Sequence, residues 1–252
     1  MIINATDKIG QVLIDKIKDR IRSNQNALIC FVGQTGSGKS YSSITLALSL
    51  SDNFQIDNIY FDIEKFIEDL SDNKFKKGDV IIIDDSGISI SNRNWQSILN
   101  KSIGIIAQSF RFLNLVLIFN VPRIRFIELQ VRSLIHFYLI HKGEQGNFSV
   151  LESKEINDLN TKLDIEAKRI ELSENSILSE IYFLLPYDTD MINEYEKRKA
   201  EFMSKLYKEL SEEIKKGRGN TEIECAYCSK KNHVKANSEY FKCEFCGMRN
   251  VI

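Results

Sequence analysis

The spacing of apolar residues along the chain predicts an alternation of helices and strands. From Ile9 to Ile21 apolar side chains recur every fourth residue, which predicts a helix. The run ALICFVG (27–33) is instead continuously apolar, as is typical of a strand buried on both faces of a sheet. Similar runs follow at NIYF (58–61), VIII (80–83), LVLIF (115–119) and LIHFYLI (134–140). Helical stretches separate them, the first over 38–50, so we expect a mainly parallel sheet with crossover helices.

The pattern changes after residue 140. HKGEQGNF predicts a hairpin turn with SVLE as its return strand, and residues 153–185 have no dominant period. From Met191 to Lys216 a narrow apolar stripe among Glu and Lys predicts an amphipathic helix, and KKGRGNT (215–221) is typical of a linker. The chain therefore divides into an N-terminal helix (1–25), a core (26–152), a mixed and helical extension (153–217) and a small C-terminal module (220–252).

Composition limits the classes of protein to which the chain can belong. Its 252 residues suffice for one domain and an appendage, and the net charge of −1 excludes a global basic field, so any nucleic-acid surface must be local. The N-terminus lacks the pattern of a signal peptide. The most apolar stretch (102–122) contains Gln108, Arg111 and Asn114, which are unsuited to a membrane span. We expect no membrane insertion and a cytoplasmic location.

The first apolar run leads directly into GQTGSGKS, which fits the pattern G-x-x-x-x-G-K-[ST] without a mismatch. Its residues are Gly33, Gln34, Thr35, Gly36, Ser37, Gly38, Lys39 and Ser40. Glycines allow the backbone to wrap closely, so that successive N–H groups point at phosphate oxygens at a helix N-terminus. In this pattern Lys39 reaches the β- and γ-phosphates of ATP and Ser40 binds Mg²⁺. The alternative is a glycine-rich turn that binds nothing.

A second motif is the acidic pair in VIIIDDS (80–86). A phosphate loop needs a second strand that delivers an acid to the metal, and Asp84 is expected to contact Mg²⁺ through water. Asp85 stands where many motor ATPases carry Glu to orient the attacking water. Because a misplacement of about 1 Å can cost about a hundredfold in rate, the shorter Asp indicates a closer backbone, slow hydrolysis or another group that positions the water. A solvated loop at a strand end is the alternative.

The order of these motifs resembles the FtsK–HerA superfamily of P-loop ATPases. NIYF lies between the two motif strands, and LVLIFN ends in the polar Asn120, which Pro122 follows closely. SNRNWQSILNKSIGIIAQSFRFLNLVLIFNVP is also similar to ATPases of archaeal viruses and mobile elements, including those with the nucleotide-binding domain of zonular occludens toxin. The resemblance covers about residues 26–142. Asp85 departs from it, since relatives usually have Glu, and this puts the speed of hydrolysis in question.

The resemblance implies an α/β fold of the P-loop NTPase type, in which a central, mainly parallel sheet is flanked by helices. It also implies that Asn120 senses the γ-phosphate and that identical subunits form a ring. In such rings one subunit supplies an arginine to its neighbour's γ-phosphate. Arg111, just before the sensor strand, is the first candidate for this role, and Arg93 and Arg132 are alternatives. Each of these arginines is otherwise an ordinary surface charge or a partner in a salt bridge.

Four of the five cysteines lie in the C-terminal module, as C-A-Y-C and C-E-F-C separated by fourteen residues. They are Cys225, Cys228, Cys243 and Cys246. This spacing is typical of a tetrahedral Zn²⁺ site, and the module resembles a zinc ribbon. Four thiolates leave no open position, so the metal would be structural. Disulfides are the alternative, less suited to an intracellular chain. The module's lysines either contact nucleic acid or form a solvated face.

Together these features predict an ATPase that uses ATP, Mg²⁺ and Zn²⁺. The leading interpretation is a DNA-translocating or packaging motor of a virus or mobile element, acting as a ring on DNA with a portal or capsid protein as a further partner. It would be cytoplasmic, or virion-associated in an infected cell. The alternative is a slow ATP-dependent switch or scaffold in virion assembly. A membrane extrusion protein and a small-molecule kinase are less consistent with the sequence, which has neither a membrane span nor an identifiable arginine-rich lid.

Overall fold

The computed structural model describes residues 8–84, 113–127, 129–155, 165–169, 180–218, 220–235 and 238–251. The chain divides into two compact units, Met1–Lys199 and Ala200–Ile252. The first unit thus continues well beyond residue 152, where the sequence placed the end of the core. It does so because strands after that residue join the same sheet.

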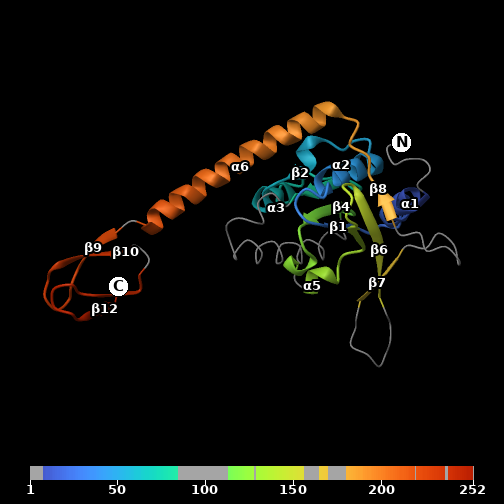
Figure 1. Cartoon of the computed structure of the whole chain (residues 1–252). Coiled ribbons are helices and arrows are strands. Elements are labelled where there is room, and N and C mark those ends of the chain that lie inside the picture. Colours follow the sequence, from blue (N-terminus) through green and yellow to red (C-terminus); the bar gives the residue numbers. More distant parts are fainter. Residues whose placement is uncertain are drawn as a thin grey trace, which may run out of the picture. The chain divides into compact units, whose positions relative to one another are not determined.

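The described strands of the first unit form an eight-stranded sheet (Figure 1). They are β1 (Ala27–Val32), β2 (Ile59–Tyr60), β3 (Val80–Ile83), β4 (Val116–Val121), β5 (Phe137–His141), β6 (Asn147–Glu155), β7 (Ile165–Arg169) and β8 (Glu180–Tyr182). Among the described residues of this unit, the helices are α1 (Lys8–Arg22), α2 (Lys39–Leu50), η1 (Ile56–Asn58), α3 (Ile63–Ser71), η4 (Ile124–Phe126), α5 (Leu129–Arg132) and the first turns of α6 (Thr189–Arg218). Every apolar run predicted as a strand is confirmed.

The strand order is β2-β3-β4-β1-β5-β6-β7, with β8 also paired to β6. The first five strands in this order run parallel, and β6 pairs antiparallel with β5, β7 and β8. Every residue of β1, β3 and β4 is buried, which explains why their sequences are continuously apolar. Because β4 separates β1 from β3, it ends between the phosphate loop and the acidic residue. The predicted α/β fold is confirmed.

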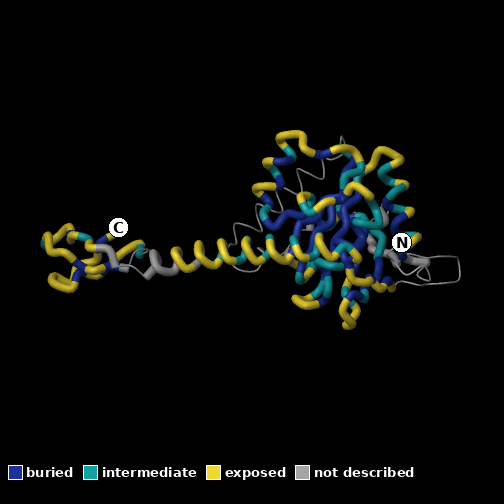
Figure 2. The backbone as a smooth tube through the Cα atoms, turned by 90° about the horizontal axis from the view of Figure 1, so that it is seen from above, coloured by how far each residue is buried: buried dark blue, intermediate teal, exposed yellow. Residues whose placement is uncertain are grey.

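Helices cover the sheet and close its core. Alternate residues of β1, β3 and β4 form one apolar cluster with Phe66 of α3 and Val131 of α5, while α2 contacts the same three strands. Figure 2 shows this interior as the dark blue part of the first unit. Cys30 lies in the cluster and is fully buried, so it packs in the core, and this burial raises the pKa of its thiol.

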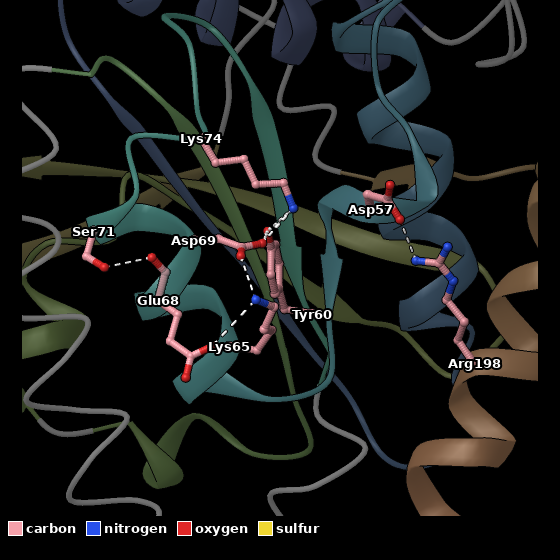
Figure 3. Close-up of polar contacts among 8 residues, drawn as sticks. All are labelled: Asp57, Tyr60, Lys65, Glu68, Asp69, Ser71, Lys74 and Arg198. Atoms are coloured by element: carbon pink, nitrogen blue, oxygen red, sulfur yellow. Dashed lines mark hydrogen bonds and ion pairs between the residues drawn. The ribbon is translucent and has the colours of Figure 1, made fainter.

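Figure 3 shows a buried carboxylate that fixes α3 against the sheet. Asp69 accepts hydrogen bonds from Tyr60 Oη at 2.7 Å and Lys74 Nζ at 2.6 Å, and it pairs with Lys65 at 2.9 Å. Burial alone raises the pKa of Asp69, but the hydrogen bonds from Lys74 and Tyr60 hold this pKa well below its usual range. The charge therefore persists in a position where an unpaired carboxylate would be costly.

The second unit contains the remainder of α6 and two antiparallel hairpins. Their strands are β9 (Asn220–Glu224), β10 (Lys231–Lys235), β11 (Tyr240–Lys242) and β12 (Arg249–Val251). Helix α6 confirms the predicted amphipathic helix but runs to Arg218, so the expected linker at 215–221 is helical in its first half. Lys215, Lys216 and Arg218 are good helix formers, and they flank Gly217 at the end of this helix. None of the described helices combines the length and apolar character that a membrane crossing requires.

Candidate functional site

The loop between β1 and α2 depends on its glycines. Gly36 and Gly38 have φ values of 83° and 87°, a region that other residues rarely adopt. A Cβ at Gly33 would lie only 2.7 Å from Ser37 Oγ. Gly38 begins α2 without a side-chain cap among the described residues, so the first N–H groups of this helix face the loop. The loop thus has the backbone geometry that a phosphate group requires.

The side chains of the loop also suit a bound phosphate. Lys39 is only 6% exposed, and its Nζ donates to the carbonyl oxygens of Gly33 at 2.7 Å and Gln34 at 3.0 Å. Ser37 Oγ is buried and has no hydrogen-bond partner within the described part of the chain. A buried hydroxyl without a partner is costly, and a phosphate oxygen in the loop would accept a hydrogen bond from it.

Asp84 follows β3 and is the polar centre of the site, with an exposure of 1%. Its Oδ1 accepts from Ser40 Oγ at 3.0 Å and Asn120 Nδ2 at 2.9 Å. Its Oδ2 accepts from Tyr195 Oη at 2.7 Å and Lys199 Nζ at 3.2 Å. The structure therefore brings together Ser40, Asp84 and Asn120, which the sequence singled out, and adds two residues of α6.

Asn120 reaches Asp84 because of its place in the sheet. It lies on β4, opposite Phe31 of β1 in the parallel register, and it is fully buried. Besides Asp84, its Nδ2 contacts Ser43 Oγ at 3.1 Å, whereas its Oδ1 has no partner among the described residues. This carbonyl oxygen lies beside Asp84 and is able to accept a hydrogen bond from a bound molecule.

The loop, α6 and Gln145 line an open cavity of about 210 Å³. It is lined by Thr35, Gly36, Gly38, Lys39, Ser40, Tyr41, Gln145, Tyr195, Glu196 and Lys199. A second cavity of about 520 Å³ shares Gly38, Tyr41 and Gln145 with the first. Its other lining residues are Ser42, Gly146, Tyr182, Phe183, Leu184 and Leu185. The two spaces adjoin, one polar and bounded by the phosphate loop, the other more apolar.

The first turns of α6 are held on the site by several contacts. Tyr195 packs against the ring of Phe61, with centroids 5.6 Å apart, and Tyr41 Oη donates to Glu196 at 2.8 Å. Arg198 pairs with Asp57 at 2.7 Å, as Figure 3 shows. Burial and the negative charge of Asp84 raise the pKa of Tyr195, so its hydroxyl remains a donor to that carboxylate.

The oxygen atoms of Ser40 and Asp84 are suitable ligands for a hard cation. Mg²⁺ prefers oxygen ligands, and the Ser40 hydroxyl and the Asp84 carboxylate offer such oxygens side by side. Ser40 and Asp84 are therefore the residues that would hold the metal of a nucleotide. Asp85, Arg93 and Arg111 lie outside the described residues. Arg132, the remaining arginine candidate, donates from Nε to the carbonyl oxygen of Ile127 at 2.8 Å.

The four C-terminal cysteines form a second candidate site. Their sulfur atoms all lie within 4.8 Å of one another, and each cysteine is a free thiol. Cys225 and Cys246 are 3.6 Å apart at sulfur, as are Cys228 and Cys243. A tetrahedral zinc site with bonds of about 2.3 Å places its sulfurs about 3.8 Å apart, so this arrangement fits the metal.

Two buried asparagines make equivalent hydrogen bonds to the cysteines. Asn250 donates from Nδ2 to Cys225 Sγ at 3.3 Å, and its Oδ1 accepts from the N–H of Ala226 at 2.9 Å. Asn232 donates from Nδ2 to Cys243 Sγ at 3.5 Å, and its Oδ1 accepts from the N–H of Glu244 at 2.9 Å. Each asparagine thus joins its own hairpin to the opposite cysteine pair.

This symmetry was missed in the sequence but is visible there. CAYCSKKN and CEFCGMRN are two copies of C-x-x-C-x-x-x-N, offset by 18 residues. The equivalent residues Ser229 and Gly247 both have positive φ values, 55° and 73°. Burial alone raises the pKa of Cys243, but N–H groups of its own turn and of Asn232 lower this pKa to about 6. Such a thiol ionises readily, as a metal ligand must.

The sequence matches no known family model and no curated protein. Similar solved structures include RuvB of Thermotoga maritima, a Holliday junction branch migration motor, with 16% identity and a TM-score of 0.38 over 53% of this chain and 44% of that one. The cytoplasmic domain of EssC has 15% identity and a TM-score of 0.36, over 73% and 45% of the two chains. EssC ATPases 2 and 3 from Geobacillus thermodenitrificans have 14% identity and a TM-score of 0.38, over 74% and 45%. The chain spans less than half of each. Values this low identify neither its activity nor its partners.

Proposed function

We propose that the chain binds Mg·ATP in the loop Gly33–Ser40 and hydrolyses it. One observation carries this proposal: the hydroxyl of Ser40 lies 3.0 Å from the carboxylate of Asp84. Ser40 lines the 210 Å³ cavity together with Lys39. The phosphate loop and the acidic strand therefore meet, as hydrolysis of a magnesium nucleotide requires.

The residues of the site divide the work as follows. The loop N–H groups and Lys39 bind the phosphates, and the adjoining 520 Å³ cavity accepts the nucleoside. Ser40 and Asp84 hold Mg²⁺, which when bound draws negative charge from the terminal phosphate. Asp85 orients the attacking water, and the unpaired Oδ1 of Asn120 accepts a hydrogen bond near the terminal phosphate.

The work done by hydrolysis is the translocation of DNA by a ring of identical chains. This part of the proposal is supported by the resemblance of residues 26–142 to the FtsK–HerA superfamily, whose motors pump or thread DNA, and to ATPases of archaeal viruses and mobile elements. In the ring, Arg111 acts on the neighbour's nucleotide, with Arg93 and Arg132 as alternatives. The cysteine module, held by zinc, engages DNA or a portal protein.

ATP turnover with and without double-stranded DNA tests this function. Wild-type chain should hydrolyse ATP, DNA should stimulate turnover, and Lys39→Ala should abolish it because the phosphates lose their buried cation. Turnover that DNA leaves unchanged would count against a motor, and turnover unaffected by Lys39→Ala would count against the assigned loop.

A slow ATP-dependent switch or scaffold in virion assembly is the second candidate, and Asp85 favours it. Where related motors use Glu, the shorter Asp holds its carboxylate farther from the water that it must orient. Asp85→Glu distinguishes the two functions. A large rise in turnover in Asp85→Glu would indicate that Asp85 keeps the native site slow, as expected for a switch or scaffold. Equal or lower turnover would favour the motor.

A further inference from the structure

Asp84 has more donors than one carboxylate can keep when a metal binds. A carboxylate has about four lone-pair sites, and Asp84 already accepts from Ser40, Asn120, Tyr195 and Lys199. A magnesium nucleotide therefore requires one of these donors to leave. The other three are a loop residue and two deeply buried side chains; Lys199 differs from them in exposure, contact length and charge.

Lys199 is the donor best placed to move. Its side chain is 30% exposed and its contact with Asp84 is the longest of the four, at 3.2 Å, whereas Tyr195 is 1% exposed and donates over 2.7 Å. Lys199 is also the only one of these four donors with a positive charge, which a metal cation repels. A lysine ammonium on its four-carbon stem can turn without moving the backbone.

The backbone of α6 beside Lys199 is held by contacts of two neighbouring residues. Arg198, the preceding residue, is fixed to Asp57 at 2.7 Å, and Glu196 is fixed to Tyr41 at 2.8 Å. The Lys199 ammonium also donates to Tyr195 Oη at 2.8 Å and lies 5.2 Å from the centre of that ring, so Tyr195 still offers it a contact once it has left Asp84. The cation thus remains within the cavity when it leaves Asp84.

A phosphate is the acceptor best suited to replace the carboxylate among the groups that this cavity can receive. Lys199 lines it together with Lys39 and Thr35 of the phosphate loop, and the carboxylate of Glu196 is already bound to Tyr41. A nucleoside triphosphate brings a terminal phosphate to this space, with acceptor oxygens and a full negative charge. A nucleoside diphosphate lacks this γ-phosphate and ends one phosphate short of the position.

We propose that Lys199 determines specificity for the triphosphate by contacting the γ-phosphate within the same chain. The inference rests on the proposed function. It concerns a lysine of the same chain that distinguishes triphosphate from diphosphate, and not the arginine that a neighbouring chain would supply. In the absence of nucleotide the ammonium pairs with Asp84, and with a triphosphate it pairs with the terminal phosphate. A diphosphate offers no γ-phosphate for it to contact.

The test compares the affinities of the full chain for Mg·AMP-PNP and Mg·ADP by calorimetry. Lys199→Met removes the charge at nearly the same length, and it should weaken binding of the triphosphate analogue about tenfold to a hundredfold while ADP affinity changes less than about twofold. Lys199→Gln keeps a hydrogen-bond donor for Asp84 and guards against a folding defect; it should show the same selective loss. Lys197→Met is the matched control, because Lys197 is exposed and pairs only loosely with Glu194, at 3.8 Å.

The outcomes separate this inference from the function on which it rests. Wild type that binds neither nucleotide overturns the proposed ATPase itself. Wild type that binds both, with a ratio of affinities unchanged in Lys199→Met and Lys199→Gln, overturns only the role of Lys199. Equal weakening for both nucleotides, or tighter binding of AMP-PNP in the variants, overturns it as well. A loss confined to AMP-PNP, absent in Lys197→Met, supports it.

Discussion

The hydroxyl of Ser40 donates to Oδ1 of Asp84 over 3.0 Å although the two residues are 44 positions apart. Neither the phosphate loop nor the acidic strand makes this contact alone. Strand β4 stands between their strands, and its Asn120 donates to the same oxygen at 2.9 Å. The sheet order thus brings two sequence motifs together and places a third polar residue between them.

Asp84→Asn should reduce ATP turnover at least about a hundredfold, because a neutral amide stabilises the metal and the developing phosphate charge far less than a carboxylate does. Turnover at saturating Mg·ATP measures this loss. Asp52→Asn, at an exposed position, is the control and should retain wild-type turnover. Activity retained in Asp84→Asn would remove this residue from the reaction.

Acid should destabilise the fold through His136. Its Nδ1 accepts from the N–H of Leu28 at 3.0 Å, and burial, with the nearby Arg20 charge, lowers its pKa to about 3. In the unfolded chain His136 therefore binds a proton near pH 6.5, whereas in the folded chain it binds one only near pH 3. Stability contributed by the neutral ring is present above this window and is lost as the pH falls through it.

Urea unfolding at pH 6 and pH 5 measures the effect. His136→Asn keeps an acceptor for Leu28 but does not titrate. Between these pH values, the free energy of unfolding of wild type should fall more steeply than that of the variant, by up to about 1.4 kcal/mol per pH unit. Parallel slopes would show that His136 does not carry the acid sensitivity.

The purified chain should contain one zinc ion, bound by four sulfurs. Cys243→Ser removes one ligand and should release the metal and unfold the hairpins of the second unit, since so small a module depends on its metal. Elemental analysis gives the zinc content, and backbone hydrogen exchange reports on the hairpins. Protection retained at Cys225–Asn250 in zinc-free protein would contradict a structural role for the metal.

The two asparagines of the repeat should contribute equally to zinc affinity. Asn232→Ala and Asn250→Ala each remove one N–H···S bond and the link between hairpins, and each should lower zinc affinity about tenfold to a hundredfold. Competition with a chromogenic chelator measures this. His233→Ala, an exposed neighbour, serves as the control. Wild-type affinity in both asparagine variants would make these contacts irrelevant to the metal.

Most of the features predicted from the sequence were recognised from short patterns of neighbouring residues. The strands were recognisable because both of their faces are buried, and the loop Gly33–Ser40 because phosphate binding needs glycines at fixed positions. Asp84 and Asn120 were identified because each ends an apolar run. In each case the physical demand acts on neighbouring residues, so the pattern is local.

Tyr195 and Lys199 were not predicted, and for a physical reason. They lie on a helix whose Glu- and Lys-rich sequence resembles any solvated helix, and they meet Asp84 only through tertiary packing more than 100 residues away along the chain. No local spacing marks one lysine among many. Asn232 and Asn250, in contrast, were detectable from the repeated C-x-x-C-x-x-x-N.

Titration of the purified chain with Mg·ATP in a calorimeter tests the central claim most directly. The account predicts heat that saturates at one nucleotide per chain, and at least about tenfold weaker binding by Lys39→Ala, because the buried ammonium beside Gly33 then no longer meets the phosphates. Absence of heat with folded wild-type protein, or equal affinity in the variant, would contradict it.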